Sequence, residues 1–269
     1  MNDVFSKILK KHSLSLFSAI PLKNCEITRS YKLQRAGFSD VESLTAVMLA
    51  VPYLTKQNKR NISAYAVSRD YHGYFAELFS VVLPELREAY PTFRFAGFAD
   101  DSPINERDAA AAAGLGVIGD NCLLITEKYS SYVFLGEIIT DLPMDASALP
   151  IKGCEGCGAC KMVCPKGDGV CLSALTQKKG ALTVDEIATI KKYGSAWGCD
   201  LCQEVCPHTI RAIKNQTIYT DIEYFKTEAV PILSSDLIDN MSDEEFSKRA
   251  YSWRKRETIR RNLEIIENS

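Results

Sequence analysis

The spacing of apolar and polar residues predicts a mixed helix-and-strand domain over the first part of the chain, about residues 1–148. Apolar residues recur at helical spacing in residues 2–13, 73–90 and 106–113, with a kink or break expected at Pro84. Apolar runs of strand length cover residues 14–20, 44–51, 61–67 and 93–98. Residues 122–126 and 132–140 are expected to pair as adjacent strands.

The remainder of the chain follows a different pattern. Residues 142–152 contain two prolines and small residues, which indicates a linker. A helix is predicted at residues 184–193, and from about residue 215 the chain becomes polar and helical, with a capping box that begins at Ser242. We therefore predict an α+β fold in three parts: an α/β domain over residues 1–148, a cysteine-rich module over residues 149–214 and a helical C-terminal segment over residues 215–269.

Eight of the ten cysteines lie between residues 154 and 206, and their spacing is regular. The first run has the form C-x2-C-x2-C-x3-C and is followed by Pro165; its members are Cys154, Cys157, Cys160 and Cys164. The remaining four are Cys171 and the run Cys199, Cys202 and Cys206, which is followed by Pro207. This is the spacing of bacterial two-cluster ferredoxins, in which the fourth cysteine of a run ligates the other cluster.

The geometry of a [4Fe–4S] cube explains this crossing over. One tight loop supplies three of the four thiolates, and the fourth comes from elsewhere because a short chain cannot circle the cube. We therefore predict one cluster held by Cys154, Cys157, Cys160 and Cys206, and a second held by Cys164, Cys171, Cys199 and Cys202. Glycines at positions 153, 156 and 158 would let the backbone approach the first cluster closely.

Two other uses of the cysteines were weighed. Structural zinc sites are built from two paired C-x2-C units, and the triple repeat of the first run leaves an awkward remainder. A disulfide framework is typical of small secreted chains, whereas this chain has 269 residues. The spacing therefore favours two [4Fe–4S] clusters over both alternatives.

Overall composition changes this picture little. A hydrophobic content of 46% and a charged content of 25% are ordinary for a soluble globular protein. The formal net charge of −2 gives no global indication of nucleic-acid or anionic-membrane binding. No apolar run approaches the roughly 18 residues of a membrane-spanning helix, so no membrane partner is expected. Reduced thiolates and exposed clusters favour the reducing cytoplasm as the location.

Several further motifs point to one family. They are R-D-Y-H at 69–72, D-D-S-P-I-N-E-R at 100–107, G-L-G-V-I-G-D-N at 114–121, Y-V-F-L-G-E-I-I-T-D-L at 132–142, C-L-S-A-L-T at 171–176 and Y-G-S-A-W-G-C-D-L-C-Q-E-V-C-P at 193–207. Taken in order with the cysteine runs, these motifs resemble the epoxyqueuosine reductases, cobalamin-dependent iron–sulfur enzymes of queuosine maturation in tRNA. The resemblance extends from about residue 40 to residue 262.

The resemblance implies a fold and a reaction. The N-terminal domain is expected to resemble the cobalamin-binding part of reductive dehalogenases, and the cysteine-rich module to be ferredoxin-like. The clusters would receive electrons from an external donor and pass them singly to the cobalt of cobalamin, and the epoxide oxygen of epoxyqueuosine would leave as water. Asp100 occupies the position of the family's proton donor, a role that suits general acid catalysis. A neighbouring negative charge, expected from Asp101, would help Asp100 keep its proton.

The remaining expectations concern ligands and partners. By resemblance, the cobalamin contacts are Arg29, Ser63, Asp100, Ser173, Cys199 and Asp200. Glu106 and Arg107 are expected to form an ion pair or to shape the pocket, and Cys25 and Cys122 to be buried thiols. Asp120 stands where members of the family commonly carry lysine.

A basic C-terminal stretch is the candidate contact for tRNA, because the chain ends at Ser269 without the helical-repeat extension of many family members. The stretch comprises Lys248, Arg249, Arg254, Lys255, Arg256, Arg260 and Arg261, interleaved with Tyr251 and Trp253. Such residues can neutralise phosphates and stack on bases, or can form a solvated helix face that packs Trp253 on the body. A cobalamin reductase of a small molecule and a ferredoxin-like electron carrier remain alternative functions.

Overall fold

A computed structural model describes residues 3–56, 59–165 and 169–268 of the chain. Contacts between residues divide the chain into two compact units, which are described separately below. The first unit comprises residues 1–52 and 72–156, and the second comprises residues 53–71 and 157–269. The chain therefore leaves the first unit, contributes residues 53–71 to the second, and returns before completing the first sheet.

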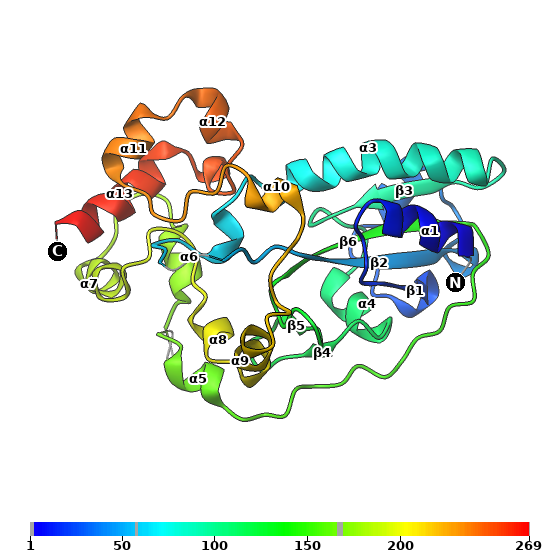
Figure 1. The fold of residues 1–269 in the computed structure, drawn as a ribbon, viewed down its shortest axis with the longest axis horizontal. Helices are drawn as coiled ribbons and strands as arrows, with labels where there is room; N and C mark the ends of the chain where they lie inside the picture. The colour runs from blue at the N-terminus through cyan, green and yellow to red at the C-terminus, as the bar shows by residue number, and fades with distance from the viewer. Residues whose placement is uncertain (1–2, 57–58, 166–168, 269) are drawn as a thin grey trace. The chain divides into compact units, whose positions relative to one another are not determined.

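The first unit contains the sheet and the helices that cover it (Figure 1). Its helices are α1 (Asp3–Lys11), α2 (Ser30–Arg35), α3 (Tyr71–Ala89) and α4 (Glu106–Ala112), with short 3-10 turns at η1 (Leu22–Asn24) and η2 (Val41–Ser43). Its strands are β1 (Phe17–Pro21), β2 (Thr45–Pro52), β3 (Phe95–Phe98), β4 (Val117–Ile118), β5 (Leu124–Ile125) and β6 (Val133–Thr140).

The main sheet has the strand order β1-β2-β6-β3, and all three of its pairings are antiparallel. The central strand β2 is apolar and buried along its whole length, as a strand covered on both faces must be. On β6, Glu137 lies opposite Met48 of β2 and Phe98 of β3, so a carboxyl group stands in the middle of the sheet. The predicted α+β class is therefore confirmed as a mixed fold with an antiparallel sheet.

Helices cover both faces of this sheet (Figure 1). On one face, Phe75 and Phe79 of α3 lie over Gly136 and Gly97, two sheet positions without a side chain. On the other face, the alanines of α4 pack in one buried cluster with Ala46, Met48 and Ala50 of β2. Small residues on a helix allow close approach, so the alanine-rich α4 lies tightly against the sheet.

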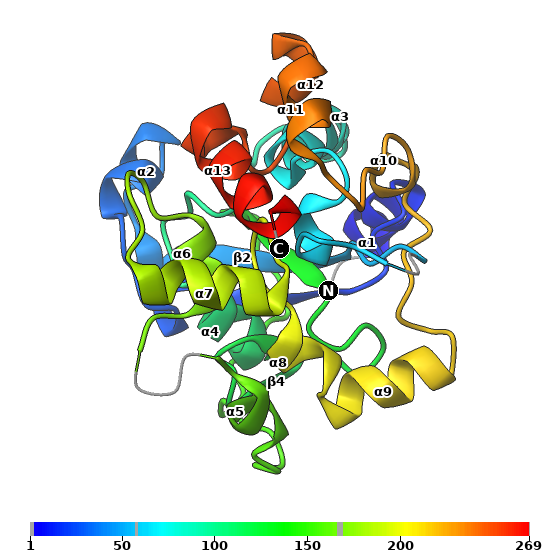
Figure 2. The ribbon, with the colours of Figure 1, turned by 90° about the vertical axis from the view of Figure 1, so that its left-hand side faces the viewer.

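The second unit is mainly helical. Its elements are η3 (Ala64–Ala66), α5 (Ala159–Val163), α6 (Leu172–Thr176), α7 (Val184–Tyr193), α8 (Leu201–Glu204), α9 (Pro207–Lys214), α10 (Glu223–Lys226), α11 (Ser235–Asn240), α12 (Asp243–Ser247), η4 (Ser252–Arg254) and α13 (Arg256–Glu267). Figure 2 shows α7 beside α6, and α13 also packs against both. The buried centre of this unit is Trp197, which contacts the rings of Tyr251 and Trp253 edge-on.

Most predicted elements are confirmed, and their boundaries differ by a few residues. The predicted helices at 73–90, 106–113 and 184–193 correspond to α3, α4 and α7, and Ser242 forms the expected capping box with Glu245. Pro84 lies inside α3, which continues through it. The predicted helix at 2–13 corresponds to α1, although Asn2 lies outside the described residues.

Two strand predictions are wrong. Residues 61–67 do not form a strand; they make one bridge, between Ile62 and Trp197, and then the turn η3. The expected pairing of 122–126 with 132–140 does not form either, because β5 pairs with β4 while β6 pairs with β2 and β3. The partner of Ile62 and the partner β2 of β6 lie far away in the sequence, where local spacing gives no information, whereas β5 pairs with the short strand β4 just before it.

Replacing Gly136 with Ala should destabilise the first unit. The added Cβ would lie 2.6 Å from a ring carbon of Phe75 and 3.0 Å from the carbonyl oxygen of Phe98, and such overpacking costs about 1–3 kcal/mol. Gly153→Ala is the matched control, because its nearest neighbour would lie at 3.9 Å. Urea denaturation of both variants measures the difference, and equal midpoints would contradict this description of the packing.

Candidate functional site

The four cysteines predicted to hold the second cluster belong to the second unit and act on one another there. Burial, followed by the charges of Cys199 and Cys164, raises the pKa of Cys202 to about 11. Burial likewise raises the pKa of Cys199, with smaller contributions from Cys171 and Cys164. Thiolates gathered at this buried place would repel one another, so the site suits a cationic iron core that balances their charge.

Backbone N–H groups also point at cysteine sulfurs, as they do around iron–sulfur clusters. In the first unit, the N–H of Asp120 donates to Sγ of Cys154 over 3.4 Å. In the second unit, the N–H of Leu201 donates to the sulfur of Cys199 and opposes the rise in its pKa caused by burial. These donors would stabilise the negative sulfur of a cluster ligand, so the residues present fit this cofactor.

The remaining predicted cluster ligands divide between the units. Cys154 belongs to the first unit, whereas Cys157, Cys160 and Cys206 belong to the second. Cys206 is buried and directly precedes α9, so Pro207 begins that helix. All ten cysteines are free thiols, and no group of three potential ligands among the described residues is close enough to hold a single metal ion. The sulfurs around a four-iron cube are farther apart than those around one ion, which is compatible with this spacing.

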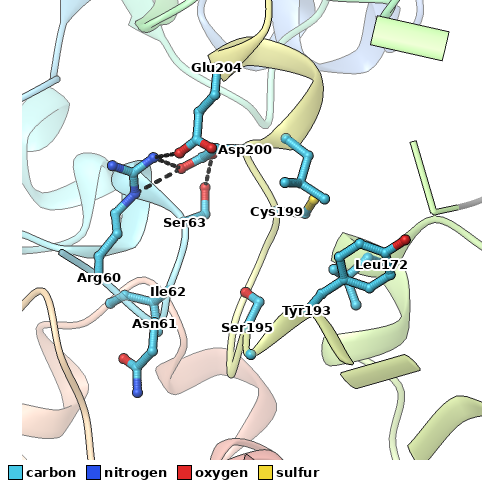
Figure 3. A pocket seen from close by; sticks show the side chains of 12 residues that line it. Arg60, Asn61, Ile62, Ser63, Leu172, Tyr193, Ser195, Cys199, Asp200 and Glu204 are labelled. Carbon is cyan, nitrogen blue, oxygen red and sulfur yellow. Dashed lines mark hydrogen bonds and ion pairs between the residues drawn. The ribbon is translucent and has the colours of Figure 1, made fainter. Parts of the chain in front are cut away.

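A buried carboxylate, Asp200, fixes the loop that carries Cys199 (Figure 3). Its oxygens accept hydrogen bonds from Nε and Nη2 of Arg60, at 3.2 and 3.0 Å, and from the hydroxyl of Ser63. The N–H of Ala64 and the side-chain amide of Gln203 donate to it as well, at 2.6 and 3.0 Å. Residues 60–64, from the N-terminal half of the chain, are thereby held against the second cysteine run.

A hollow of about 440 Å³, including its open mouth, lies beside this carboxylate (Figure 3). Its walls come from residues 60–63, from α6 and the end of α7, and from the loop leading into α8. The lining residues are Arg60, Asn61, Ile62, Ser63, Leu172, Tyr193, Gly194, Ser195, Cys199, Asp200, Leu201 and Glu204. Gly198 is needed nearby, because its φ is +72° and an added Cβ would lie 2.5 Å from Cβ of Ser63.

The structure brings together only some of the predicted cobalamin contacts. Ser63, Cys199 and Asp200 line the same hollow. Ser173 does not line it; its hydroxyl accepts from the Gln177 amide at 3.3 Å, and only the neighbouring Leu172 faces the hollow. Arg29 belongs to the first unit, where its Nη1 lies 3.0 Å from Oδ1 of Asp101.

Asp100 begins an exposed loop in front of α4 and has a left-handed backbone, with φ 62°. Its N–H donates to both carboxyl oxygens of Glu106, each at 3.1 Å. Its side chain is 64% exposed, and Oδ2 lies 3.3 Å from Nε2 of His72. Left-handed backbone is unfavourable for residues other than glycine and persists only where the surrounding structure stabilises it. The loop therefore holds Asp100, the predicted proton donor, in a defined conformation.

One expectation about the surroundings of Asp100, an ion pair between Glu106 and Arg107, is wrong, while the expected effect of Asp101 on Asp100 stays a prediction. Asp101 forms ion pairs with Lys32 and Arg29, and the hydrogen bond from Lys32 lowers the pKa of Asp101. Its charge is therefore balanced, and Glu106 is the carboxyl that contacts Asp100. Arg107 pairs with Asp108 at 2.8 Å, so the expected pair between Glu106 and Arg107 does not form.

Glu106 belongs to a buried pair of carboxyl groups. Burial raises its pKa to about 7, and the charge of Asp100 contributes in the same direction. Glu137 is fully buried in β6, and burial followed by the charge of Glu106 raises its pKa well above the usual range. The hydroxyl of Ser102 donates to Glu137 Oε1, and a hydrogen bond joins the carboxyl groups of Glu137 and Glu106, which requires one of them to carry a proton.

Most charges of the basic C-terminal stretch are used within the second unit. Arg249 is buried and donates to the carbonyl of Glu228, and Arg256 donates to the carbonyls of Ile238 and Met241. Arg260 pairs with Asp239, and Arg261 donates to the carbonyl of Gly180. Trp253 is 57% exposed, with one edge-on contact to Trp197. The stretch therefore mainly joins the C-terminal helices.

Some functional candidates were not found from the sequence. Arg60 lies 140 residues from Asp200, and no local pattern relates them. Glu137 left a clear signal, a single acidic residue in an otherwise apolar strand. Of the two cysteines outside the cluster runs, Cys25 is mostly buried, and burial raises its pKa to about 12, whereas Cys122 is exposed, contrary to expectation.

Comparison with curated proteins gives the family. An epoxyqueuosine reductase of Listeria monocytogenes is 31% identical over 250 residues, which cover 85% of this chain and 64% of that protein. An epoxyqueuosine reductase of Gloeobacter violaceus is 31% identical over 231 residues, covering 81% of this chain and 71% of that protein. Both relatives are oxidoreductases by name. The chain belongs to the epoxyqueuosine reductase family, and it spans about two thirds of the length of these relatives.

Solved structures agree with this membership. The structure of epoxyqueuosine reductase from Streptococcus thermophilus is 26% identical, with a TM-score of 0.76 over 97% of this chain and 79% of that one. An epoxyqueuosine reductase crystallised with an epoxyqueuosine-modified tRNA-Tyr stem loop has the same fold, at 23% identity and a TM-score of 0.73 over 97% of this chain and 80% of that one. No family model matches the chain. No helix in the described part of the chain is long and apolar enough to cross a bilayer.

Replacing Asp200 with Ala should strongly destabilise the second unit. The change removes the buried acceptor shared by Arg60 and Ser63, and breaking one side of a buried pair costs about 3–5 kcal/mol. Glu204→Gln is the matched control, because it removes a 48% exposed carboxylate from the same arginine. Thermal unfolding of the two variants compares them, and similar losses would contradict the buried role of Asp200.

Glu106 should make the protein less stable as the pH rises from about 4.5 to about 7. The folded protein keeps this proton up to about pH 7, whereas the unfolded chain releases it near 4.5, so the folded state binds more protons within that window. The Glu106→Gln variant should lose this part of the pH dependence. Unfolding midpoints measured at about pH 5 and about pH 8 test this, and an unchanged difference in the variant would refute it.

Proposed function

We propose that the protein is a cobalamin- and iron–sulfur-dependent reductase that converts epoxyqueuosine to queuosine in tRNA. The observation that carries this proposal is the extent of the family match. A match over 85% of the chain omits about 40 residues, so it must include both the Asp100 loop and all eight cysteines of the two runs. The matched span therefore covers both the proposed acid and the proposed electron-transfer part of the chain.

In this proposal, two [4Fe–4S] clusters occupy the cysteine runs. One is held by Cys154, Cys157, Cys160 and Cys206, and the other by Cys164, Cys171, Cys199 and Cys202. The mutual influence of the last four on their pKa values supports the second set. The N–H groups of Asp120 and Leu201 would stabilise the sulfur charge of the first and second sets respectively.

The hollow beside Asp200 is the place in the second unit where cobalamin contacts are proposed. Its lining joins polar groups, from Ser63 and Ser195, with apolar ones, from Ile62 and Leu172, as a large amphipathic ligand requires. Cys199, a proposed cluster ligand, lines the same hollow, which would keep the path for electrons short. When bound, cobalamin would supply the low-potential cobalt that reduces the substrate.

Asp100 is the proposed proton donor. Loss of the epoxide oxygen leaves negative charge on that oxygen, and a positioned carboxylic acid lowers the barrier by protonating it. The exposed side chain of Asp100 can reach a substrate, while its backbone is fixed by Glu106. Its proton passes to the leaving oxygen, a second proton from solvent completes the water that leaves, and an external donor supplies the two electrons that the reduction requires.

The proposed macromolecular partner is tRNA. The solved relative that contains a modified tRNA stem loop supports this assignment. Within the basic C-terminal stretch, Trp253 is exposed, and Arg254 stacks on its ring at 3.8 Å. An exposed aromatic ring beside a guanidinium group is a surface on which an unpaired base can stack.

The internal use of Arg249, Arg256, Arg260 and Arg261 favours a second candidate, reduction of a smaller substrate by the same cofactors. A shift assay with tRNA over a salt series separates the two candidates. Binding that weakens steeply with salt supports the tRNA enzyme.

Replacing Asp100 with Asn should abolish conversion of epoxyqueuosine and leave the iron content unchanged, at about eight irons per chain. Asn keeps the size of the side chain but cannot donate the carboxyl proton. The measurement is nucleoside analysis of epoxyqueuosine-containing tRNA after incubation with anaerobically reconstituted enzyme, cobalamin and a reductant.

Asp101→Asn is the control, because it removes a neighbouring carboxyl that is already balanced by Lys32 and Arg29. It should keep most of the activity. Full activity in the Asp100→Asn enzyme would end the proposed role of Asp100.

A further inference from the structure

The backbone of Asp100 is fixed by a carboxyl group on the helix that follows it. Glu106 is the first residue of α4, and both of its oxygens lie 3.1 Å from the backbone nitrogen of Asp100. Asp100 has a left-handed backbone, which costs about 1–2 kcal/mol for a residue with a Cβ. The carboxyl of Glu106 therefore helps to hold the loop in the conformation that presents the Asp100 side chain.

A second carboxyl, Glu137, lies behind Glu106. It is fully buried in the middle of the sheet, one oxygen accepts from Ser102, and its carboxyl is hydrogen-bonded to that of Glu106. A charged carboxylate would not persist in such a place, so Glu137 carries a proton. Above about pH 7, where Glu106 loses its own proton, the negative charge near the Asp100 loop therefore resides on Glu106.

We propose that Glu106 is a positioning residue for proton donation by Asp100. It holds Asp100 through the backbone N–H, and its negative charge favours the protonated form of the Asp100 carboxyl. This inference rests on the proposed function, in which Asp100 donates the proton. In the reaction, the O–H bond of Asp100 breaks as its proton passes to the leaving oxygen. The new Asp100 carboxylate then lies beside a second negative charge, and uptake of a proton from solvent restores the starting state.

The other charged groups around these carboxyls are His72, which opposes the effect of Glu106 when it is protonated, and Asp101 with its two cations. His72, on α3, lies 3.3 Å from the Asp100 carboxyl, and its charge acts against the rise in the pKa of Glu106. Asp101 is balanced by Lys32 and Arg29. Among the described residues, no lysine or arginine forms an ion pair with Glu106.

On the remaining sides the charges are balanced or neutral. Arg107 and Asp108, the next residues of α4, pair with each other. On the side of Glu137, the other titratable neighbour is Cys25, whose pKa is raised by burial and by Glu137, so it stays neutral. None of these neighbours therefore balances the charge of Glu106, and that charge acts on Asp100.

The first test is the pH dependence of turnover by holoenzyme carrying Glu106→Gln. Gln can still accept the Asp100 N–H, but it removes the negative charge. The alkaline limb of the kcat profile should therefore move to lower pH by roughly one unit or less, because the groups are partly exposed. Lowering the assay pH should then restore most of the activity.

Two further variants separate charge from position. Glu106→Asp keeps the charge but is too short for the same hydrogen bonds, so it should lower kcat at every pH while keeping the alkaline limb near its original place. Glu26 supplies a different carboxylate, which accepts a hydrogen bond from Asn105, the residue before α4, at 2.9 Å. Glu26→Gln should leave the profile unchanged. A parallel, unshifted profile for Glu106→Gln would overturn the proposal.

The second test does not depend on turnover. In iron-loaded protein without substrate, the carboxyl carbon of Asp100 can be followed by 13C NMR and assigned by its loss in the Asp100→Asn variant. Its titration midpoint should fall in the Glu106→Gln variant and stay unchanged in Glu26→Gln. An equal midpoint in all three proteins would overturn the inference. An active Asp100→Asn enzyme would instead refute the proposed function itself.

Discussion

The buried carboxylate of Asp200 makes the interactions on which the second unit depends. Two hydrogen bonds from Arg60, one from Ser63 and one from the N–H of Ala64 converge on it. These donors lie in a segment that the chain inserts between two parts of the first unit. A single desolvated charge thus fixes an N-terminal segment beside Cys199, and loss of Arg60 would remove the cation that balances that charge.

The acid loop of the first unit uses carboxyl groups in a different way. Asp200 is stabilised as an anion by many donors, whereas Glu137 has one hydroxyl donor and no cation. Burial therefore drives Glu137 to its neutral form, while Glu106, at the edge of the same cluster, titrates near neutral pH. Acids whose environments differ in this way can separate the roles of holding a charge and passing a proton.

The sequence predicted best those features that local chemistry dictates. The cysteine spacing, the capping box at Ser242 and the helical period of α3 and α7 each depend on neighbours within a few residues, and the structure agrees with the last two. It could not predict contacts made across long separations. The pairing of β6 with β2, the bridge between Ile62 and Trp197, and the salt bridge of Arg60 with Asp200 all join distant segments. The resemblance correctly placed Ser63 and Asp200 together, but it gave no reason to expect that one donates to the other.

The central claim is that electrons from the two cysteine runs reach cobalt bound to this chain. The most direct measurement is an anaerobic titration of the fully iron-loaded protein with cobalamin, followed by its visible spectrum before and after a reductant is added. The account predicts saturable, stoichiometric uptake and a reduction of the bound corrinoid that is lost in a Cys202→Ser variant but kept in Cys122→Ser. Protein that contains its full iron but neither binds nor reduces cobalamin would contradict it.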